Sequence, residues 1–383
     1  MRVAPKVYGW CPGALRPMMS GDGLVVRIRA PLGRLTQEQA RGLSKLSERC
    51  GNGLMDLSAR ANLQLRGVRE AAHEVLLDGL RNLDLLDLDE TAEARRNVTV
   101  QPFWSNGDET HRIALALNTA LTAATDLKLP GKFGFALDCG PAPVIQGSSA
   151  DIRIERAGET LILRADGAEP GLPVTPDTAP QEALALARWF LKQGGVSQGR
   201  GRMKALVKRI GPPETHTHPK TSQLYKAQPG QTEAGLLAAL PFGQIEAQAF
   251  AALAELGPLR LTPWRMVLLE GAADAPSSMI LDPADPLLNV TACTGAPGCP
   301  QALSTTRDLA RDLASFVPAG AKLHVSGCAK GCAHPATAPL TLTATGADEF
   351  ALIRSGLASD APLRTNLTAT ALRQSPDLLR TET

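Results

Sequence analysis

The sequence predicts an α+β protein built from two similar halves. The first of two matching stretches, GLVVRIRAPLGRLTQEQARGLSKLSERCGNGLMDLSARANLQLRGV, begins at Gly23, and the second, GLLAALPFGQIEAQAFAALAELGPLRLTPWRMVLLEGA, begins at Gly235. Each opens with an apolar strand pattern, passes through Pro and Gly into a helical pattern, and ends with a second strand pattern. The repeated order of these patterns predicts an internal duplication.

The likeness between the halves continues along the chain. LSAR, ending at Arg60, matches TPWR, ending at Arg265, and RNVTVQ matches LNVTAC. LPGKFGFALDCG matches PAGAKLHVSGCAKG, which pairs Lys132 with Lys322. Chance similarity between Leu- and Ala-rich segments is the alternative. If the duplication is real, each half is a strand–helix–strand unit followed by an α/β unit.

These patterns also predict where the units begin and end. Between the halves lies GGVSQGRGRMKALVKRIGPPETHTHPKTS, which is Gly-rich at first, then a short basic helix, then a Pro-rich turn. The predicted units are 1–75 (first strand–helix–strand unit), 85–190 (first α/β domain), 191–222 (basic linker), 223–285 (second strand–helix–strand unit), 286–358 (second α/β domain) and 359–383 (C-terminal tail).

Composition limits the partners of this 383-residue chain. Charged residues make up 20% of it and the formal net charge is only +2, so no overall basic field favours nucleic acid or a membrane surface. The N-terminus lacks an apolar signal segment, and no apolar run reaches membrane-spanning length. We therefore expect a cytoplasmic, monomeric protein whose cysteines stay reduced and serve metals or catalysis.

Four of the seven cysteines fall into two close pairs. They read C-x5-C in TACTGAPGCPQ, with Cys293 and Cys299, and C-x3-C in SGCAKGCAHP, with Cys328 and Cys332. Zinc knuckles usually have the tighter C-x2-C spacing, whereas a [4Fe–4S] cube takes each thiolate at a separate corner. The spacing therefore favours a cluster over zinc or free thiols. The other three cysteines are scattered and are expected to be inert: Cys11, Cys50 and Cys139.

These two cysteine motifs resemble the cluster signature of the sirohaem nitrite and sulfite reductase family. The resemblance extends from Tyr8 to about Leu357. It implies the duplicated nitrite/sulfite reductase fold with pseudo-twofold symmetry, in which two ferredoxin-like half-domains accompany two α/β domains. It also implies that all four paired cysteines bind the cluster and that Cys332 faces the reaction centre as a catalytic residue.

The same resemblance implies a basic site in the first half. LSARANLQLRGV resembles the strand that holds the family's anion, and this puts Arg60 in the anion position with Asn62, Gln64 and Arg66 beside it. Alternate residues of a strand share one face, so these four would form a polar wall. A solvated sheet face is the alternative reading of the same pattern.

Further cations match the family's binding segments. RRNV places Arg96 at a second arginine position, and LPGKF places Lys132, a catalytic candidate, at the first of two lysine positions, the second being Gly134 here. In the linker, GRGRMK resembles a segment that clasps tetrapyrrole carboxylates. We call the charged members of this set the predicted clamp: Arg60, Arg66, Arg96, Lys132, Arg200 and Arg202. Arg pairs bidentately with carboxylates, which suits a polyacidic ring.

The N-terminal stretch GWCPGALRPMMSGDGLVVRIRAPLGRLT resembles one subfamily, whose members oxidise a tetrapyrrole substrate with O2. Because Gly134 removes one cation, this activity is favoured over a sirohaem-dependent nitrite or sulfite reductase, which is the alternative. A non-enzymatic iron–sulfur carrier is the third possibility. NADH is the implied reductant, but no G-x-G-x-x-G fingerprint follows a strand, so a separate reductase or carrier is expected to supply electrons.

The subfamily resemblance also implies a mononuclear non-haem iron beside the cluster. Its ligands would be His and carboxylate with open positions. The candidates are His216 and His218 in ETHTHP and His334, two residues after Cys332. A polar turn and an ordinary loop residue are the alternative readings.

Overall fold

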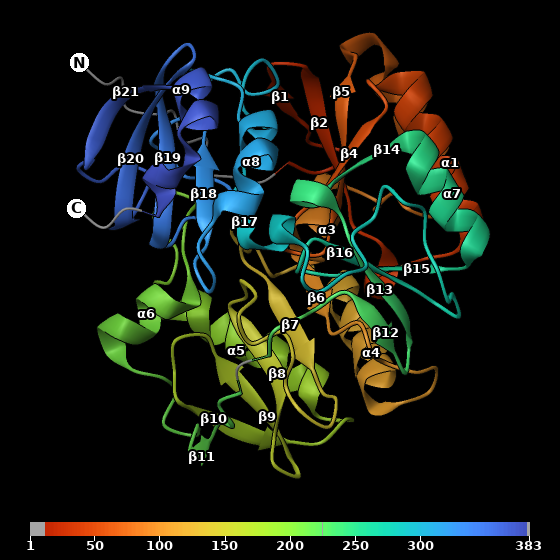
Figure 1. Cartoon of the computed structure of the whole chain (residues 1–383). Helices are drawn as coiled ribbons and strands as arrows, with labels where there is room; N and C mark the ends of the chain where they lie inside the picture. The colour runs from red at the N-terminus through yellow and green to blue at the C-terminus, as the bar shows by residue number, and fades with distance from the viewer. Residues whose placement is uncertain (1–11, 224, 381–383) are drawn as a thin grey trace.

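The computed structural model describes residues 12–223 and 225–380, and within these ranges the strands form four sheets. Two sheets belong to the strand–helix–strand units and two to the α/β domains (Figure 1). Tyr8 and Cys11, and with them the start of the N-terminal motif, lie outside the described residues. In the described part of the chain, every helix is too short or too polar to span a membrane.

The two half-domain sheets exchange strands. In the first sheet β14 pairs antiparallel with β4, and in the second sheet β3 pairs antiparallel with β15. Each sheet therefore contains one strand from the other half of the chain. In sheet order, the first comprises β1 (Met18–Ser20), β2 (Gly23–Ile28), β5 (Leu63–Val68), β4 (Leu54–Leu57) and β14 (Gln244–Glu246), and the second comprises β12 (Gly230–Thr232), β13 (Gly235–Ala239), β16 (Met266–Leu269), β15 (Leu259–Leu261) and β3 (Arg34–Leu35).

A Pro-x-Gly turn precedes each exchanged strand and directs it into the sheet of the other half. The 3-10 turns η1 (Pro31–Gly33) and η3 (Pro241–Gly243) occupy equivalent places in the two halves. The central residue has φ +53° in one turn and +56° in the other, and the glycines have φ +73° and +74°. Glycine tolerates this left-handed geometry, which explains why both halves place it there.

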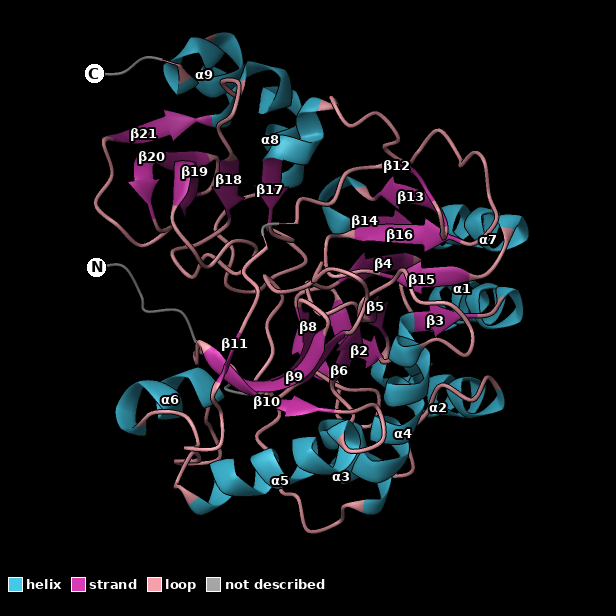
Figure 2. Cartoon of the chain, turned by 90° about the horizontal axis from the view of Figure 1, so that it is seen from below, coloured by secondary structure: helices cyan, strands magenta, loops and turns pink. Residues whose placement is uncertain are grey.

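Helices α1 (Gln37–Cys50) and α7 (Ala247–Leu256) lie side by side against these sheets (Figure 2). Thr36 begins α1 with a complete capping box to Gln39. One apolar core contains residues of both halves, including Leu43 and Phe250, which are fully buried. The core also takes up Leu76 from α2 (His73–Asn82), which lies beyond the unit's predicted end at residue 75. The two half-domains are therefore one packing unit.

The first α/β domain has a six-stranded mixed sheet. Its parallel strands β6, β7 and β8 are followed by an antiparallel meander to β11. Helices α4 and α5 cover one face with Ile113, Leu117 and Phe190. The elements are α3 (Glu90–Arg95), β6 (Val98–Val100), α4 (Glu109–Ala123), β7 (Phe135–Asp138), β8 (Ile152–Ala157), β9 (Thr160–Ala165), β10 (Pro170–Val174), α5 (Ala179–Lys192), α6 (Met203–Ile210) and β11 (His218–Pro219).

The second α/β domain repeats this plan with five strands. β17, β18 and β19 are parallel, and β20 and β21 continue antiparallel. Residues predicted as a polar tail form β21 and α9, and Leu372 of α9 is fully buried in the domain core. The elements are β17 (Val290–Ala292), α8 (Arg307–Leu313), β18 (Leu323–Ser326), β19 (Ala338–Gly346), β20 (Glu349–Gly356), β21 (Arg364–Thr368) and α9 (Ala369–Gln374).

Strand register corrects one of the predicted correspondences between the halves. Val98 pairs with Phe135 in the first α/β domain, and Val290 pairs with Leu323 in the second. Since both valines follow Asn in the shared Asn-Val-Thr motif, the residue preceding Leu323 corresponds to Gly134. Lys322 therefore corresponds to Gly134 and not to Lys132.

Candidate functional site

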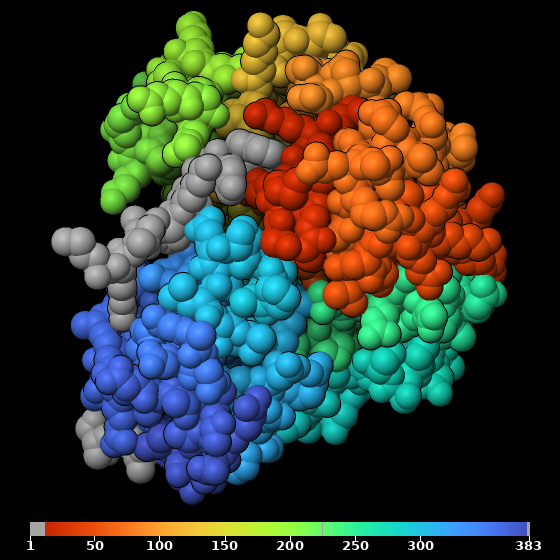
Figure 3. Space-filling model, turned by 90° about the horizontal axis from the view of Figure 1, so that it is seen from above, coloured from red at the N-terminus to blue at the C-terminus, as the bar shows by residue number. Residues whose placement is uncertain are grey.

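Two adjacent parallel strands bring the paired cysteines together. Cys293 follows β17 and Cys328 follows shortly after β18, and Ala292 pairs with Val325 at the ends of these strands. Parallel neighbours end at the same sheet edge, which is where binding sites of α/β sheets are found. In Figure 3 this domain, in blue, lies beside the first half-domain, in red and orange.

A tight turn at a glycine lies between the two cysteines of each pair. Gly295 has φ +70° between the first two cysteines, and Gly331 has φ +62° between the last two. A Cβ on Gly295 would lie 2.8 Å from Thr306 Oγ1, so both its space and its φ require glycine.

The four thiols influence one another. Burial raises the pKa of the Cys332 thiol, Lys330 lowers it, and the neighbouring thiols of Cys328, Cys293 and Cys299 raise it further. The Gly327 N–H donates to Cys293 Sγ at 3.1 Å, as backbone amides do around cluster thiolates. No three His, Cys, Asp or Glu side chains of the described residues surround a single-ion position. Four neighbouring thiols together with a backbone N–H donor are the donor set that an iron–sulfur cube uses, since its ligands occupy separate corners.

Two cysteines of the described residues lie outside the C-x5-C and C-x3-C motifs. Cys50 and Cys139 are buried and free. Burial raises the pKa of both thiols, which disfavours the reactive thiolate. They behave as small core residues, as the sequence predicts.

We call the two segments that carry the paired cysteines, residues 293–299 and 328–332, the cysteine loop. Arg66 joins the first half-domain to the first of these segments. Its guanidinium donates to Asp22 Oδ1 at 2.8 Å and to the Gly298 carbonyl at 2.9 Å, next to Cys299. The side chain is buried, and Asp56 lies 3.7 Å away. Its charge is therefore balanced by carboxylates, and its contacts support the loop.

Arg60 lies in a turn and not on the predicted strand. The Ala61 N–H donates to the Ser58 carbonyl, Ala61 has φ +53°, and β5 begins only at Leu63. The turn breaks the alternation that would place residues 60 and 62 on one face. Gln64 and Arg66 do lie on β5 and face away from Leu63 and Leu65, which belong to the core.

Two members of the predicted clamp, Arg60 and Arg202, meet at Ser149, and the backbone carbonyl of a third, Lys132, contacts Arg60; we call these three residues the Ser149 cluster. Arg60 donates to Ser149 Oγ and to the Lys132 carbonyl, both at 3.0 Å. Arg202 donates to the same Ser149 Oγ at 3.1 Å and to Asp151 Oδ1 at 2.8 Å. Within the described chain no carboxylate lies within 4 Å of the half-buried Lys132 ammonium. Besides the ion pair of Arg202 with Asp151, the Ser149 cluster therefore holds the positive charge of Lys132, which no carboxylate of the described residues neutralises.

Other predicted residues are held elsewhere. Arg96 pairs with Asp87 at 2.6 Å and donates to the Arg29 carbonyl, so its charge is already balanced. Arg200 is exposed on the linker. Asn62 is buried, and its Nδ2 has no hydrogen-bond partner among the described residues, which leaves both of its N–H donors for a ligand.

Gly134 has no space for a side chain. A Cβ there would lie 2.7 Å from Asn97 Nδ2 and 3.3 Å from Arg60 Nη1. A second lysine at this position would collide with groups that the Ser149 cluster uses. The local packing therefore excludes a cationic side chain at position 134.

The histidines proposed for a second metal divide into two places. His216 and His218 precede or form β11, at the opposite edge of its sheet from β6 and far from β18 in Figure 1. His334 lies beside His324, their ring centroids 5.7 Å apart. The structure thus brings only His334 of the three predicted residues close to the cysteine loop.

The sequence reasoning missed His324. It is 1% exposed on β18, and neither ring nitrogen has a hydrogen-bond partner among the described residues. Burial, with His334 and Arg265 adding, lowers its pKa to about 4, so the imidazole is neutral near pH 7. Neutral imidazole is the metal-binding form. Its place four residues before Cys328 was the available signal.

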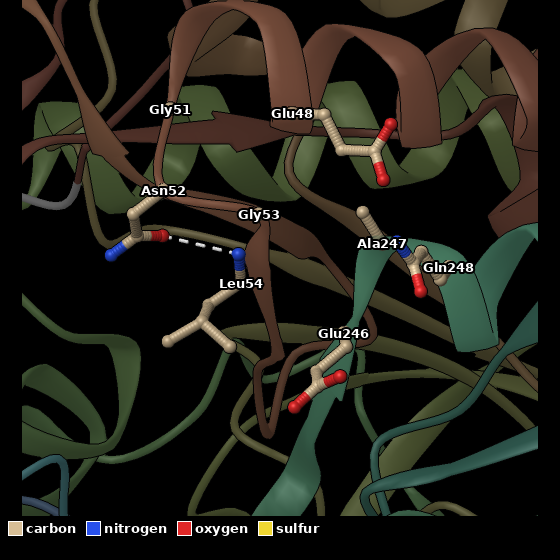
Figure 4. A pocket seen from close by; sticks show the side chains of 8 residues that line it. All are labelled: Glu48, Gly51, Asn52, Gly53, Leu54, Glu246, Ala247 and Gln248. Atoms are coloured by element: carbon tan, nitrogen blue, oxygen red, sulfur yellow. Dashed lines mark hydrogen bonds between the residues drawn. The ribbon is translucent and has the colours of Figure 1, made fainter.

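Two sizeable cavities lie near the half-domains. One of about 480 Å³ is bordered by α1, β14 and α7, where the Glu48 and Glu246 side chains approach the opening (Figure 4). Its acidic lining opposes a polyacidic ligand. The other, about 410 Å³, lies beside the cysteine loop and reaches Ala59 next to Arg60. We call it the Trp264 cavity.

Proteins similar in sequence to this chain include a precorrin-3B synthase and nitrite reductases. The chain is 27% identical to a precorrin-3B synthase of Sinorhizobium sp, over 94% of this chain and 85% of that protein. It is 24% identical to a ferredoxin–nitrite reductase of Leptolyngbya laminosa, over 88% of this chain and 79% of that protein.

The model of the nitrite/sulfite reductase ferredoxin-like half domain matches residues 16–83, which form β1 to α2. Over most of its length the chain is similar to members of the nitrite/sulfite reductase family, and residues 16–83 match that family's half-domain model. The structure of Mycobacterium tuberculosis NirA protein covers 92% of this chain and is itself covered to 79%, with a TM-score of 0.64 and 17% identity. The predicted resemblance to this family and the predicted nitrite/sulfite reductase fold are confirmed.

Proposed function

We propose that this protein is a precorrin-3B synthase, an O2- and NADH-dependent monooxygenase of aerobic cobalamin biosynthesis. Its substrate would be precorrin-3A, hydroxylated at C20 while the ring-A acetate closes as a γ-lactone. One oxygen atom of O2 enters the macrocycle and the other leaves as water, with two electrons supplied from NADH through a separate reductase or carrier.

The observation that carries this proposal is the packed glycine at position 134. An anion-reducing site would use a second lysine there, but Asn97 and Arg60 fill that space. The Ser149 cluster retains Lys132 and two arginines, which suit carboxylates of an acidic macrocycle. The 27% identity to a precorrin-3B synthase across 94% of the chain supports the same assignment.

The cysteine loop fits a [4Fe–4S] cluster held by Cys293, Cys299, Cys328 and Cys332. When bound, the cluster supplies single electrons, and a non-haem iron supplies the site at which O2 is activated. His324 and His334 are the residues that would hold such an iron, because their rings adjoin the loop and His324 is buried with both nitrogens unpartnered among described residues.

The chain's own residues would bind and orient the substrate. Lys132 and Arg60 would pair with macrocycle carboxylates, and Asn62 Nδ2 would donate to a polar group of the ring. Asp151 holds Arg202 in place by accepting from its Nε and from the Met203 N–H. Ser149 fixes the separation of the two guanidinium groups.

A decisive experiment begins with oxygen-free purification and analysis of iron, acid-labile sulfide and the absorption spectrum. We expect a brown cluster spectrum without a sirohaem band, and conversion of precorrin-3A to a product heavier by one oxygen atom. Arg60→Gln should weaken macrocycle binding about tenfold, as loss of one carboxylate pair of about 1.4 kcal/mol would. A sirohaem band with nitrite or sulfite reduction would instead identify the reductase alternative.

A further inference from the structure

The Trp264 cavity has a lining unlike the rest of the molecule. Its cations are Lys226, Arg265 and Lys322, and no Asp or Glu is among the described residues that line it. Most guanidinium groups of the predicted clamp are instead paired with aspartates. A cavity whose lining holds three cations and no carboxylate favours an anionic occupant.

Aromatic side chains form one wall of this cavity. Trp264 stacks on Phe103 with ring centroids 5.9 Å apart and contacts Tyr225 at 5.3 Å. Both Trp264 and Tyr225 line the space, which at about 410 Å³ lies in the range of small-molecule sites. Rigid aromatic walls favour flat conjugated ligands through stacking.

The internal duplication relates this cavity to the predicted substrate site. In the first half the Ser58 N–H donates to the Asn62 carbonyl, and in the second half the Thr262 N–H donates to the Met266 carbonyl. The residue before the acceptor has positive φ in both halves, Ala61 in the first and Arg265 in the second. Trp264 therefore stands where Arg60 stands in the first half, and the predicted match of LSAR with TPWR, which pairs Arg60 with Arg265, is wrong by one residue. Lys322 likewise stands where the first half has Gly134.

The two halves thus place their cations at different members of these two pairs of equivalent positions. The first half has Arg60 and no cation at Gly134, whereas the second has an aromatic ring and a cation at the equivalent places. The second cavity also reaches Ala333 and His334, which directly follow Cys332. Its ligand would lie against the cysteine loop.

We propose that the Trp264 cavity is a second binding site, distinct from the Ser149 cluster, for a flat aromatic molecule that carries a phosphate or carboxylate. The ring stacks against the Trp264 and Tyr225 wall. Lys226, Lys322 and Arg265 bind the acidic group. Electron-carrying aromatic nucleotides belong to this chemical class, and so do the edges of acidic tetrapyrroles.

Flavin mononucleotide is the probe for this site, with riboflavin as the matched ligand that lacks the phosphate. Titration of the full-length protein, followed by flavin fluorescence, should show one saturable site that binds flavin mononucleotide more tightly than riboflavin. Trp264→Leu and Lys322→Gln should each weaken flavin mononucleotide binding about tenfold, the effect of about 1.4 kcal/mol. Competition with coproporphyrin tests whether the ligand of this cavity is a tetrapyrrole. If coproporphyrin displaces flavin mononucleotide equally from the parent protein and from Arg60→Gln, the cavity binds acidic tetrapyrroles.

Lys128→Gln, which removes an exposed lysine elsewhere, and Arg60→Gln should both bind flavin mononucleotide like the parent protein. Thermal unfolding and circular dichroism establish that each variant is folded. Absence of saturable binding, or equal binding by the parent, Trp264→Leu and Lys322→Gln, overturns the proposal. Weakening by Arg60→Gln alone also overturns it. The measurement needs neither precorrin-3A nor O2, so its result is independent of the proposed reaction.

Discussion

At the scale of single residues, the molecule separates charges that support the structure from charges that remain for ligands. Arg66 and Arg96 are held by aspartates, whereas Lys132 and the cations of the Trp264 cavity have no carboxylate within ion-pair distance among the described residues. Sequence spacing identified basic residues of both kinds. Only the positions of Asp22 and Asp87 distinguish them.

Asp138 provides a residue-scale test of burial. Burial raises the pKa of this carboxyl from 3.8 to about 6, although the Val144 and Ile145 N–H groups oppose the shift. The folded protein therefore keeps a proton that the unfolded chain loses, and stability falls as pH rises from about 4 to about 6. Relative to Asp138→Asn, the parent should lose about 3 kcal/mol of unfolding free energy across this window.

Urea unfolding of both proteins at several pH values from 4 to 7 measures the difference. A constant difference across the range would mean that Asp138 titrates with an ordinary pKa in the folded protein. The variant also keeps one acceptor oxygen for the Val144 and Ile145 amides, so the slope with pH, and not the offset, is the relevant quantity.

At the scale of elements, turns determine where the functional groups lie. The turn at Ala61 removes Arg60 from the strand, and the turns at Gly295 and Gly331 gather the cysteines. The Ser149 loop then supplies the acceptor on which Arg60 and Arg202 converge. Strand alternation alone predicted the positions of Gln64 and Arg66 but not these convergences.

Gly331→Ala should damage the cysteine loop selectively. Its φ of +62° costs an alanine about 1 kcal/mol, and its Cβ would lie 3.2 Å from Ala358 Cβ, displacing the residue before Cys332. Gly158→Ala is the matched control, since Gly158 has the same φ but no atom within 4 Å of the added Cβ.

Both variants should lose about 1 kcal/mol of unfolding free energy. Only Gly331→Ala should lose acid-labile sulfide and the brown absorption band. Equal sulfide content in the two variants would contradict the role of this turn in positioning Cys332.

At the scale of the whole molecule, the exchanged strands β3 and β14 make the two halves depend on each other. Each half-domain sheet lacks a strand without its counterpart, and α1 and α7 share one core. In a fragment of residues 1–222 or 223–383 alone, the half-domain should therefore not unfold cooperatively, because it exposes half of that core, and any remaining transition should come from the α/β domain with its own core.

Circular dichroism during thermal unfolding measures this dependence. Mixing the two fragments after dilution from denaturant should restore a single transition. An isolated fragment that unfolds at the same temperature and with the same loss of ellipticity per residue as the full chain would show that the half-domains fold independently.

The sequence alone determined the duplication, the family and the clustering of four cysteines, because apolar periodicity and motif spacing are local properties of the chain. Tertiary structure decided which arginines are neutralised, that Lys322 corresponds to Gly134, that strands are exchanged, and that His324 adjoins His334. These features depend on contacts between residues distant in the chain, such as Arg66 with Gly298 and Arg60 with Ser149. No local pattern encodes such a contact, since it exists only once both segments have packed.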